Sequence, residues 1–76
     1  MSELRIIKER RFYDEHGTKK FAMLEEGQTV KIEKWLNAGR GPLLCSVVDP
    51  SEASRDCGVR DGMLVEIDWE DLGFEL

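Results

Sequence analysis

The fold is decided by residues 49–69, which read DPSEASRDCGVRDGMLVEIDW. The first half of this stretch has the signals of a short capped helix over about residues 50–57. Asp49 suits the N-cap, Pro50 suits the first helical position, and Glu52 falls three residues after the cap, as in a capping box. These signals place one short helix in a chain whose other patterns favour strands.

The second half of the stretch predicts a helix stop, a turn and a strand. Gly58 fits the left-handed position that follows a helix, and Gly62 suits the tight turn that comes next. On the helix, Ala53 and Cys57 are four residues apart and are expected to face the core. The strand after the turn is strongly alternating, with four positions expected to face inward: Met63, Val65, Ile67 and Trp69.

Four further strands are expected before this stretch. They cover residues 4–13, 18–24, 29–36 and 43–48. The first two form a hairpin, because Gly17 can supply the positive φ of the turn between them. In the first strand, Leu4, Ile6 and Phe12 are expected to share one face. A helix is the alternative for this segment, because Leu4, Ile7 and Arg11 also have helical spacing. The fourth is a continuous apolar run, which suits a strand that is buried on both faces.

These elements predict an α+β, mostly β fold. About five short, largely antiparallel strands form a small barrel-like sheet with one helix, because closure removes unpaired strand edges. With 76 residues, the chain has room for one domain, 1–76. Two segments stand apart in composition. One is a glycine-rich loop expected to be mobile, with Gly39, Arg40 and Gly41, and the other is a candidate acidic docking tail at 70–76.

Residues 49–67 resemble a helix–turn–strand unit of cradle-loop and double-psi barrels and of the AbrB-type DNA-binding fold. The matching residues are Pro50, Glu52, Ala53, Gly58, Val59, Asp61, Gly62 and Val65. PDZ domains contain a similar unit. Met63 stands where these families usually have Asp. The resemblance covers less than a third of the chain, is interpreted as shared local structure, and carries no residue roles.

Charge and cysteine content narrow the class of protein. The net charge is −5, with +1 in residues 1–38 and −6 in residues 39–76. This balance disfavours a basic nucleic-acid surface. It indicates mainly solubility, with attraction to a basic partner as the alternative. The chain has neither a signal-peptide pattern nor an apolar run near the ~20 residues of a membrane span, so we expect no membrane association. Cys45 and Cys57 are expected to be reduced thiols of a cytoplasmic protein, with a Cys45–Cys57 bridge as the alternative.

The sequence offers no pattern for catalysis, a metal site or a cofactor. His16 is the single histidine, and it lies in an expected hairpin turn that provides no pocket for a general base. Both cysteines fall at positions expected to face the core, where a thiol behaves as an apolar group. Glu66 and Asp68 should share a strand face, which is read as a solvated surface rather than a cation site. We therefore expect a protein that is not an enzyme.

The acidic C-terminal segment carries the main functional hypothesis. Its candidate partner-binding residues are Trp69, Asp71, Leu72, Phe74 and Leu76. Aromatic anchors among acids suit docking on a partner protein with a basic surface. The alternative is that these residues cover the domain's own core. The expected function is that of a small, acidic, cytosolic binding or regulatory protein acting through protein–protein interaction.

Two other functions remain as alternatives. A nucleic-acid-binding regulator would use basic residues converging on the first hairpin, namely Arg5, Lys8, Arg10, Arg11, Lys19 and Lys20. A mixed-charge solvated hairpin is the competing interpretation of the same residues. An acidic decoy inhibitor, of the type that mobile elements carry, would instead present residues 66–75 to a basic nucleic-acid-binding site.

Overall fold

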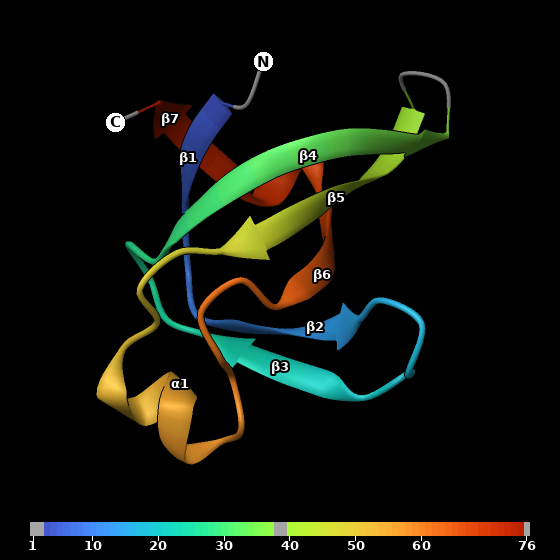
Figure 1. Ribbon diagram of the computed structural model, residues 1–76. Helices are drawn as coiled ribbons and strands as arrows, with labels where there is room; N and C mark the ends of the chain where they lie inside the picture. The colour runs from blue at the N-terminus through green and yellow to red at the C-terminus, as the bar shows by residue number, and fades with distance from the viewer. Residues whose placement is uncertain (1–2, 38–39, 76) are drawn as a thin grey trace.

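The computed structural model describes residues 3–37 and 40–75 as one antiparallel sheet with a short α-helix (Figure 1). The strands are β1 (Glu3–Ile7), β2 (Arg11–Glu15), β3 (Phe21–Leu24), β4 (Thr29–Asn37), β5 (Arg40–Val47), β6 (Leu64–Asp68) and β7 (Leu72–Glu75). The helices are α1 (Glu52–Asp56) and the 3-10 helix η1 (Trp69–Asp71). Within the described residues, neither helix is long and apolar enough to span a bilayer.

The described sheet has seven strands in the order β3-β2-β6-β5-β4-β1-β7 and is open. The mostly β fold with one short helix is confirmed, whereas the prediction of about five strands in a barrel-like sheet is wrong. One extra strand arises because the predicted first strand is two, and the other is β7. The two edge strands, β3 and β7, have four residues each, and short edges limit unwanted pairing with other chains.

The N-terminal strand prediction fails at the segment between β1 and β2. β1 ends at Ile7 and pairs with β4 and β7, while β2 begins at Arg11 and pairs with β3 and β6. Ile7 and Tyr13 are buried, whereas Leu4 and Phe12 are exposed. The single strand expected to carry Leu4, Ile6 and Phe12 on one face is therefore divided, with Leu4 and Ile6 in β1 and Phe12 in β2.

The remaining strand predictions hold closely. Gly17 has φ +83° in the turn between β2 and β3, as the hairpin pattern predicted. Residues 43–47 of β5 are all buried, which confirms a strand covered on both faces. The fully buried side chains of the core come mainly from these central strands and include Ile7, Leu24, Val30, Leu43, Cys45, Val47, Val65 and Ile67.

The predicted mobile loop around residues 37–42 is largely replaced by strand. β4 continues to Asn37, β5 begins at Arg40, and these two residues pair. Gly39 and the side chain of Arg40 lie outside the described part of the structure. Gly41 belongs to β5 with φ +70°. The register of β4 against β5 shifts between Ile32 and Lys34 and again between Trp35 and Asn37.

Helix α1 begins two residues later than predicted. Ser51, not Asp49, is the N-cap, and its hydroxyl accepts a hydrogen bond from the backbone N–H of Ser54 at 3.2 Å. The helix end is as predicted: Gly58 has φ +93°, and the N–H of Val59 donates to the Ser54 carbonyl at 3.0 Å. This bond and the one from the Gly58 N–H to Arg55 form a Schellman motif.

The buried residue of α1 is Ser54 rather than the predicted Ala53 and Cys57, which are exposed. The Ser54 hydroxyl donates to the Met23 carbonyl at 2.8 Å and so connects the helix to β3. The cysteines are both free: Cys45 is buried in the sheet and Cys57 is exposed. The alternative of a Cys45–Cys57 bridge is therefore not realised.

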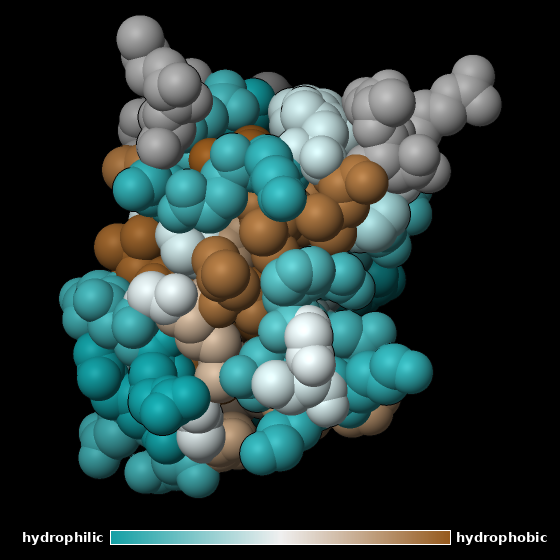
Figure 2. Space-filling view, turned by 45° about the vertical axis from the view of Figure 1, so that its right-hand side comes forward, coloured by the Kyte–Doolittle hydropathy of each residue, from teal (hydrophilic) through white to brown (hydrophobic). Residues whose placement is uncertain are grey.

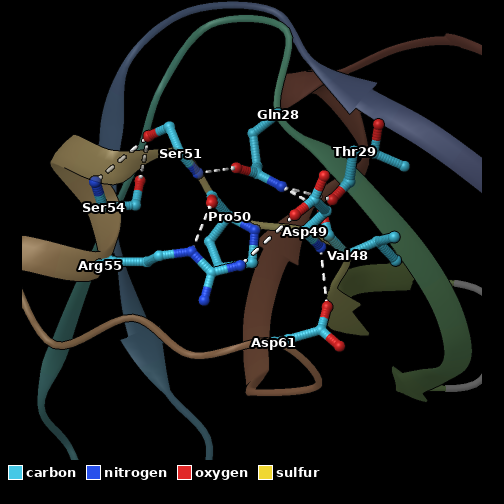
Figure 3. Close-up of polar contacts among 9 residues, drawn as sticks. All are labelled: Gln28, Thr29, Val48, Asp49, Pro50, Ser51, Ser54, Arg55 and Asp61. Carbon is cyan, nitrogen blue, oxygen red and sulfur yellow. Dashed lines mark hydrogen bonds and ion pairs between the residues drawn. The ribbon is translucent and has the colours of Figure 1, made fainter.

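Gln28 joins the entry to α1 to the sheet (Figure 3). Its side-chain nitrogen donates to the carbonyls of Thr29 at 2.9 Å and Val48 at 2.6 Å. Its side-chain oxygen accepts from the N–H of Ser51 at 3.3 Å. Because both the nitrogen and the oxygen of this buried amide are hydrogen-bonded, Gln28 fixes the position of the chain where it leaves β5. No pattern in the sequence predicted this contact.

Candidate binding site

Two exposed tryptophans form an aromatic platform at one end of the sheet. Trp69 was predicted to face inward at the end of a strand, but β6 ends at Asp68, and Trp69 lies in η1 with 44% of its surface exposed. Its ring stacks on that of Trp35, which is 41% exposed, with centroids 5.4 Å apart and 27° between the planes. We call Trp35, Trp69 and the adjoining Arg5 the tryptophan platform.

Arg5 holds the platform in place. Its guanidinium carbon lies 4.9 Å from the centroid of Trp69, within the range of a cation–π contact. Nη1 donates to the Gly73 carbonyl at 3.2 Å, and Nη2 donates to Glu3 at 3.0 Å. Arg5 therefore makes its contacts within the protein. It supports the aromatic surface and is poorly placed to bind a nucleic-acid phosphate.

The C-terminal segment is part of the sheet in the described residues. Leu72 is buried and pairs with Ile7, so β7 extends the sheet beside β1. Asp71 is also buried, and it accepts a hydrogen bond from Arg11 at 2.8 Å. Leu76 and the side chain of Phe74 lie outside the described residues. Residues 72–75 thus form a strand of the sheet with Leu72 buried, and Trp69 just before them is exposed.

A groove lies along β2 and β6. The described register pairs these strands at Asp14 with Glu66 and at Glu15 with Val65. Beyond these pairs lies a hollow of about 330 Å³, here called the β2–β6 groove. It is lined by aromatic, acidic and a few other residues, namely Arg11, Phe12, Tyr13, Asp14, Phe21, Pro42, Glu66, Asp68 and Asp71.

Tyr13 belongs to the hydrophobic core beside this groove and carries a buried hydroxyl. Tyr13 is 6% exposed, and its hydroxyl has no hydrogen-bond partner in the part of the chain that the structure describes. An unsatisfied buried polar group costs about 1–3 kcal/mol. Burial, reinforced by the negative charge of Asp71, raises the pKa of Tyr13 to about 12. The group is therefore a neutral hydroxyl that can still accept and donate a hydrogen bond.

The rim of the groove combines aromatic rings and carboxylates. Phe12 and Phe21 are 62% and 69% exposed, and the register places both on the face that also carries Asp14. Glu66 pairs with Asp14, and Asp68 lies two residues further along β6 on the same face. Figure 2 shows that apolar surface gathers in a band across one face of the molecule, with hydrophilic residues around it. Such a surface suits a ligand with both apolar and cationic parts.

The predicted basic surface does not form one patch. Lys8 and Arg10 lie at the corner between β1 and β2, whereas Lys19 and Lys20 lie at the opposite end of the β2–β3 hairpin. Arg11 pairs with Asp71 at 2.8 Å and with Glu9 at 3.2 Å. The mixed-charge interpretation of this hairpin agrees better with the geometry.

The polar groups at two other candidate sites, around His16 and around Gln28, already contact other residues of the protein. His16 lies in the exposed hairpin turn, with Nδ1 3.2 Å from a Glu66 carboxylate oxygen. Among residues 3–37 and 40–75, no group of three or more His, Cys, Asp or Glu side chains is placed to hold a metal. A hollow of about 500 Å³ lies beside Gln28, whose amide is already bonded at both ends.

Comparison with known protein families, curated proteins and solved structures found no significant match.

Proposed function

We propose that this protein is a non-catalytic binding protein that docks on a basic surface of a partner protein through the tryptophan platform. The observation that carries this proposal is the stacked pair of Trp35 and Trp69, each more than 40% exposed. Large aromatic side chains held rigid at a surface are the residues that contribute most to binding energy at protein interfaces.

The charge around the platform favours a basic partner. Asp68 and Glu70 flank Trp69, are exposed, and line a hollow of about 350 Å³ with it. The chain carries a net charge of −5, concentrated in its second half. Complementary charge accelerates association and selects the partner, while the aromatic anchors supply most of the affinity.

Affinity capture from the source cell tests this proposal with three baits: the unchanged protein, Trp69→Ala and Leu64→Ala. Leu64 is an exposed apolar residue outside the platform and serves as the matched control. A partner should be retained by the unchanged protein and by Leu64→Ala, lost with folded Trp69→Ala, and released as salt rises. Equal retention by all three baits would contradict the proposal.

Intrinsic fluorescence then tests direct contact. Both tryptophans of the chain belong to the platform, so their emission reports on this surface alone. The purified partner should shift or quench the emission in a saturable manner. Binding without any change in emission would place the interface elsewhere.

An acidic decoy is the second candidate function. It is favoured by the carboxylates of Asp14, Glu66 and Asp68, which lie on one face across β2 and β6. A decoy predicts that duplex DNA and this protein compete for the same partner. Direct nucleic-acid binding is the third candidate, and retention of a labelled oligonucleotide at low salt would support it.

A further inference from the structure

We infer that the ion pair between Arg11 and Asp71 positions the tryptophan platform, so that two residues outside the platform control its binding to the partner. Nη1 of Arg11 lies 2.8 Å from a carboxylate oxygen of Asp71. Asp71 is the last residue of η1, and Trp69 is the first. The inference rests on the proposed function for its effect on binding, whereas its structural part concerns the contact between Trp69 and Trp35 and needs no partner.

The first support is that η1 has little stability of its own. It is a single 3-10 turn of three residues, and among the described residues no side chain caps its N-terminus. Its internal hydrogen bond joins the N–H of Leu72 to the Trp69 carbonyl. Because the hydrogen bonds of a 3-10 helix have poor geometry, so short a turn depends on contacts with other elements. The orientation of Trp69 therefore depends on the contacts that fix η1 to the sheet.

The second support is that two such contacts meet at Asp71. Its backbone carbonyl accepts a hydrogen bond from the N–H of Lys8 at 3.0 Å, and its carboxylate accepts one from Arg11 at 2.8 Å. Lys8 directly follows β1 and Arg11 begins β2, so Asp71 is bound on both sides of the corner between these strands. A turn that is fixed at its last residue holds Trp69, two residues earlier, in one orientation.

The third support is the burial of the Asp71 carboxylate. Asp71 is 8% exposed, and a buried carboxylate without a counter-charge is strongly destabilising. The two charges are coupled, because the negative charge of Asp71 is the main cause that raises the pKa of Arg11 above its usual value. Without Arg11, η1 would relieve the buried charge by moving Asp71 towards water. This movement would draw the ring of Trp69 away from that of Trp35.

NMR of the folded full chain tests the positioning through nuclear Overhauser effects between the two indole rings. These effects should be lost in Arg11→Met, which removes the cation and keeps most of the apolar stem. They should return in the double variant Arg11→Met/Asp71→Asn, which has no buried charge to relieve. Rings that stay in contact in Arg11→Met would overturn the inference. A double variant whose rings stay apart would also overturn it, because Arg11 would then act by a route other than the charge of Asp71.

Two controls separate positioning from a general loss of structure. Glu9→Gln removes the other carboxylate that Arg11 contacts, at 3.2 Å on the exposed surface, and should leave the ring contact unchanged. The methyl resonances of Val30 and Val47, which are fully buried and pair between β4 and β5, report whether the sheet is intact. If Arg11→Met unfolds the sheet, a folded double variant with its rings in contact supports the inference, and an unfolded double variant overturns it.

Partner capture then separates this inference from the proposed function. Capture should fall several-fold with Arg11→Met, recover with the double variant, and stay unchanged with Glu9→Gln. Ring contact that persists in Arg11→Met, with capture still dependent on Trp69, would refute the positioning role and leave the proposed function standing. Ring contact that depends on Arg11, with capture independent of Trp69, would support the positioning role and refute docking through the platform.

Discussion

Trp35 stacks on Trp69 with their ring centroids 5.4 Å apart, and this contact joins β4 to η1. The guanidinium of Arg5, from β1, lies over the ring of Trp69. Three separate elements therefore meet at one aromatic surface. Each ring remains more than 40% exposed. The pair is thus both a tertiary contact and a surface available to a partner, and the two properties can be measured separately.

A double-mutant cycle on Trp35→Ala and Trp69→Ala should give a coupling free energy of about 0.5–1.5 kcal/mol, because offset aromatic stacking adds to simple area burial. Urea unfolding of the two single variants and the double variant measures it. If the two substitutions changed the free energy of unfolding additively, the stacking contact would make no net contribution to stability.

Tyr13→Phe should raise the free energy of unfolding by about 1 kcal/mol, because the substitution removes a buried hydroxyl that has no partner in the described structure. The midpoint of urea unfolding measures the change. Tyr13→Leu serves as the contrasting variant, since it also removes ring packing and should destabilise the protein. A loss of stability in Tyr13→Phe would mean that the hydroxyl makes a stabilising hydrogen bond.

Alkaline pH should destabilise the fold through Cys45. Burial raises the pKa of this thiol to about 12, against 9.0 for a free thiol. Because the unfolded state loses the proton first, the stabilisation is complete below pH 9 and is lost as pH rises towards 12. The slope from this group is about 1.4 kcal/mol per pH unit. Cys45→Ala should flatten the fall in stability above pH 9, while Cys57→Ala should leave it unchanged.

The two thiols should also differ in reactivity. Cys57 is exposed at the end of α1, whereas Cys45 is buried and has a raised pKa. Brief treatment of the native protein with iodoacetamide should therefore modify Cys57 alone, and mass spectrometry of the digested protein shows which residue carries the label. In denaturant both thiols should react. Labelling of Cys45 in the native protein would show that the centre of the sheet opens readily.

Ser51→Ala should lower the free energy of unfolding by about 1 kcal/mol, because it removes the side-chain cap of α1. Glu52→Ala, an exposed change one residue further along, should cost only a few tenths. Chemical unfolding of both variants decides between the observed cap and the one expected from sequence. With Asp49 as the cap, Ser51→Ala would be neutral or stabilising, since alanine is the better helix former.

Local sequence signals predicted the structure correctly where one residue type is strongly preferred for a particular backbone conformation. Gly58 and Gly17 both adopt the positive φ that their turns require. The burial of residues 43–47 follows from an apolar run that is too short for an ordinary helix. In each case the determinant lies within a few residues of the structure it specifies.

Features that depend on distant partners were not predictable. The division of the expected first strand depends on distant partners, because β1 pairs with β4 and β7 while β2 pairs with β3 and β6. Trp69 turns outward because η1 replaces the end of the expected strand. The β2–β6 groove is lined by residues from distant parts of the chain, and the isolation of the Tyr13 hydroxyl depends on side chains from several elements. No local pattern encodes that arrangement.

The position of β1 constrains when the protein can fold during its synthesis. β1 is the first strand along the chain, yet it lies between β4 and β7, and Ile7 pairs with Leu72. During synthesis, one edge of β1 therefore stays unpaired until β7 has been made and has docked beside it. Loss of residues 72–75 would leave the β1 edge exposed and open to aggregation.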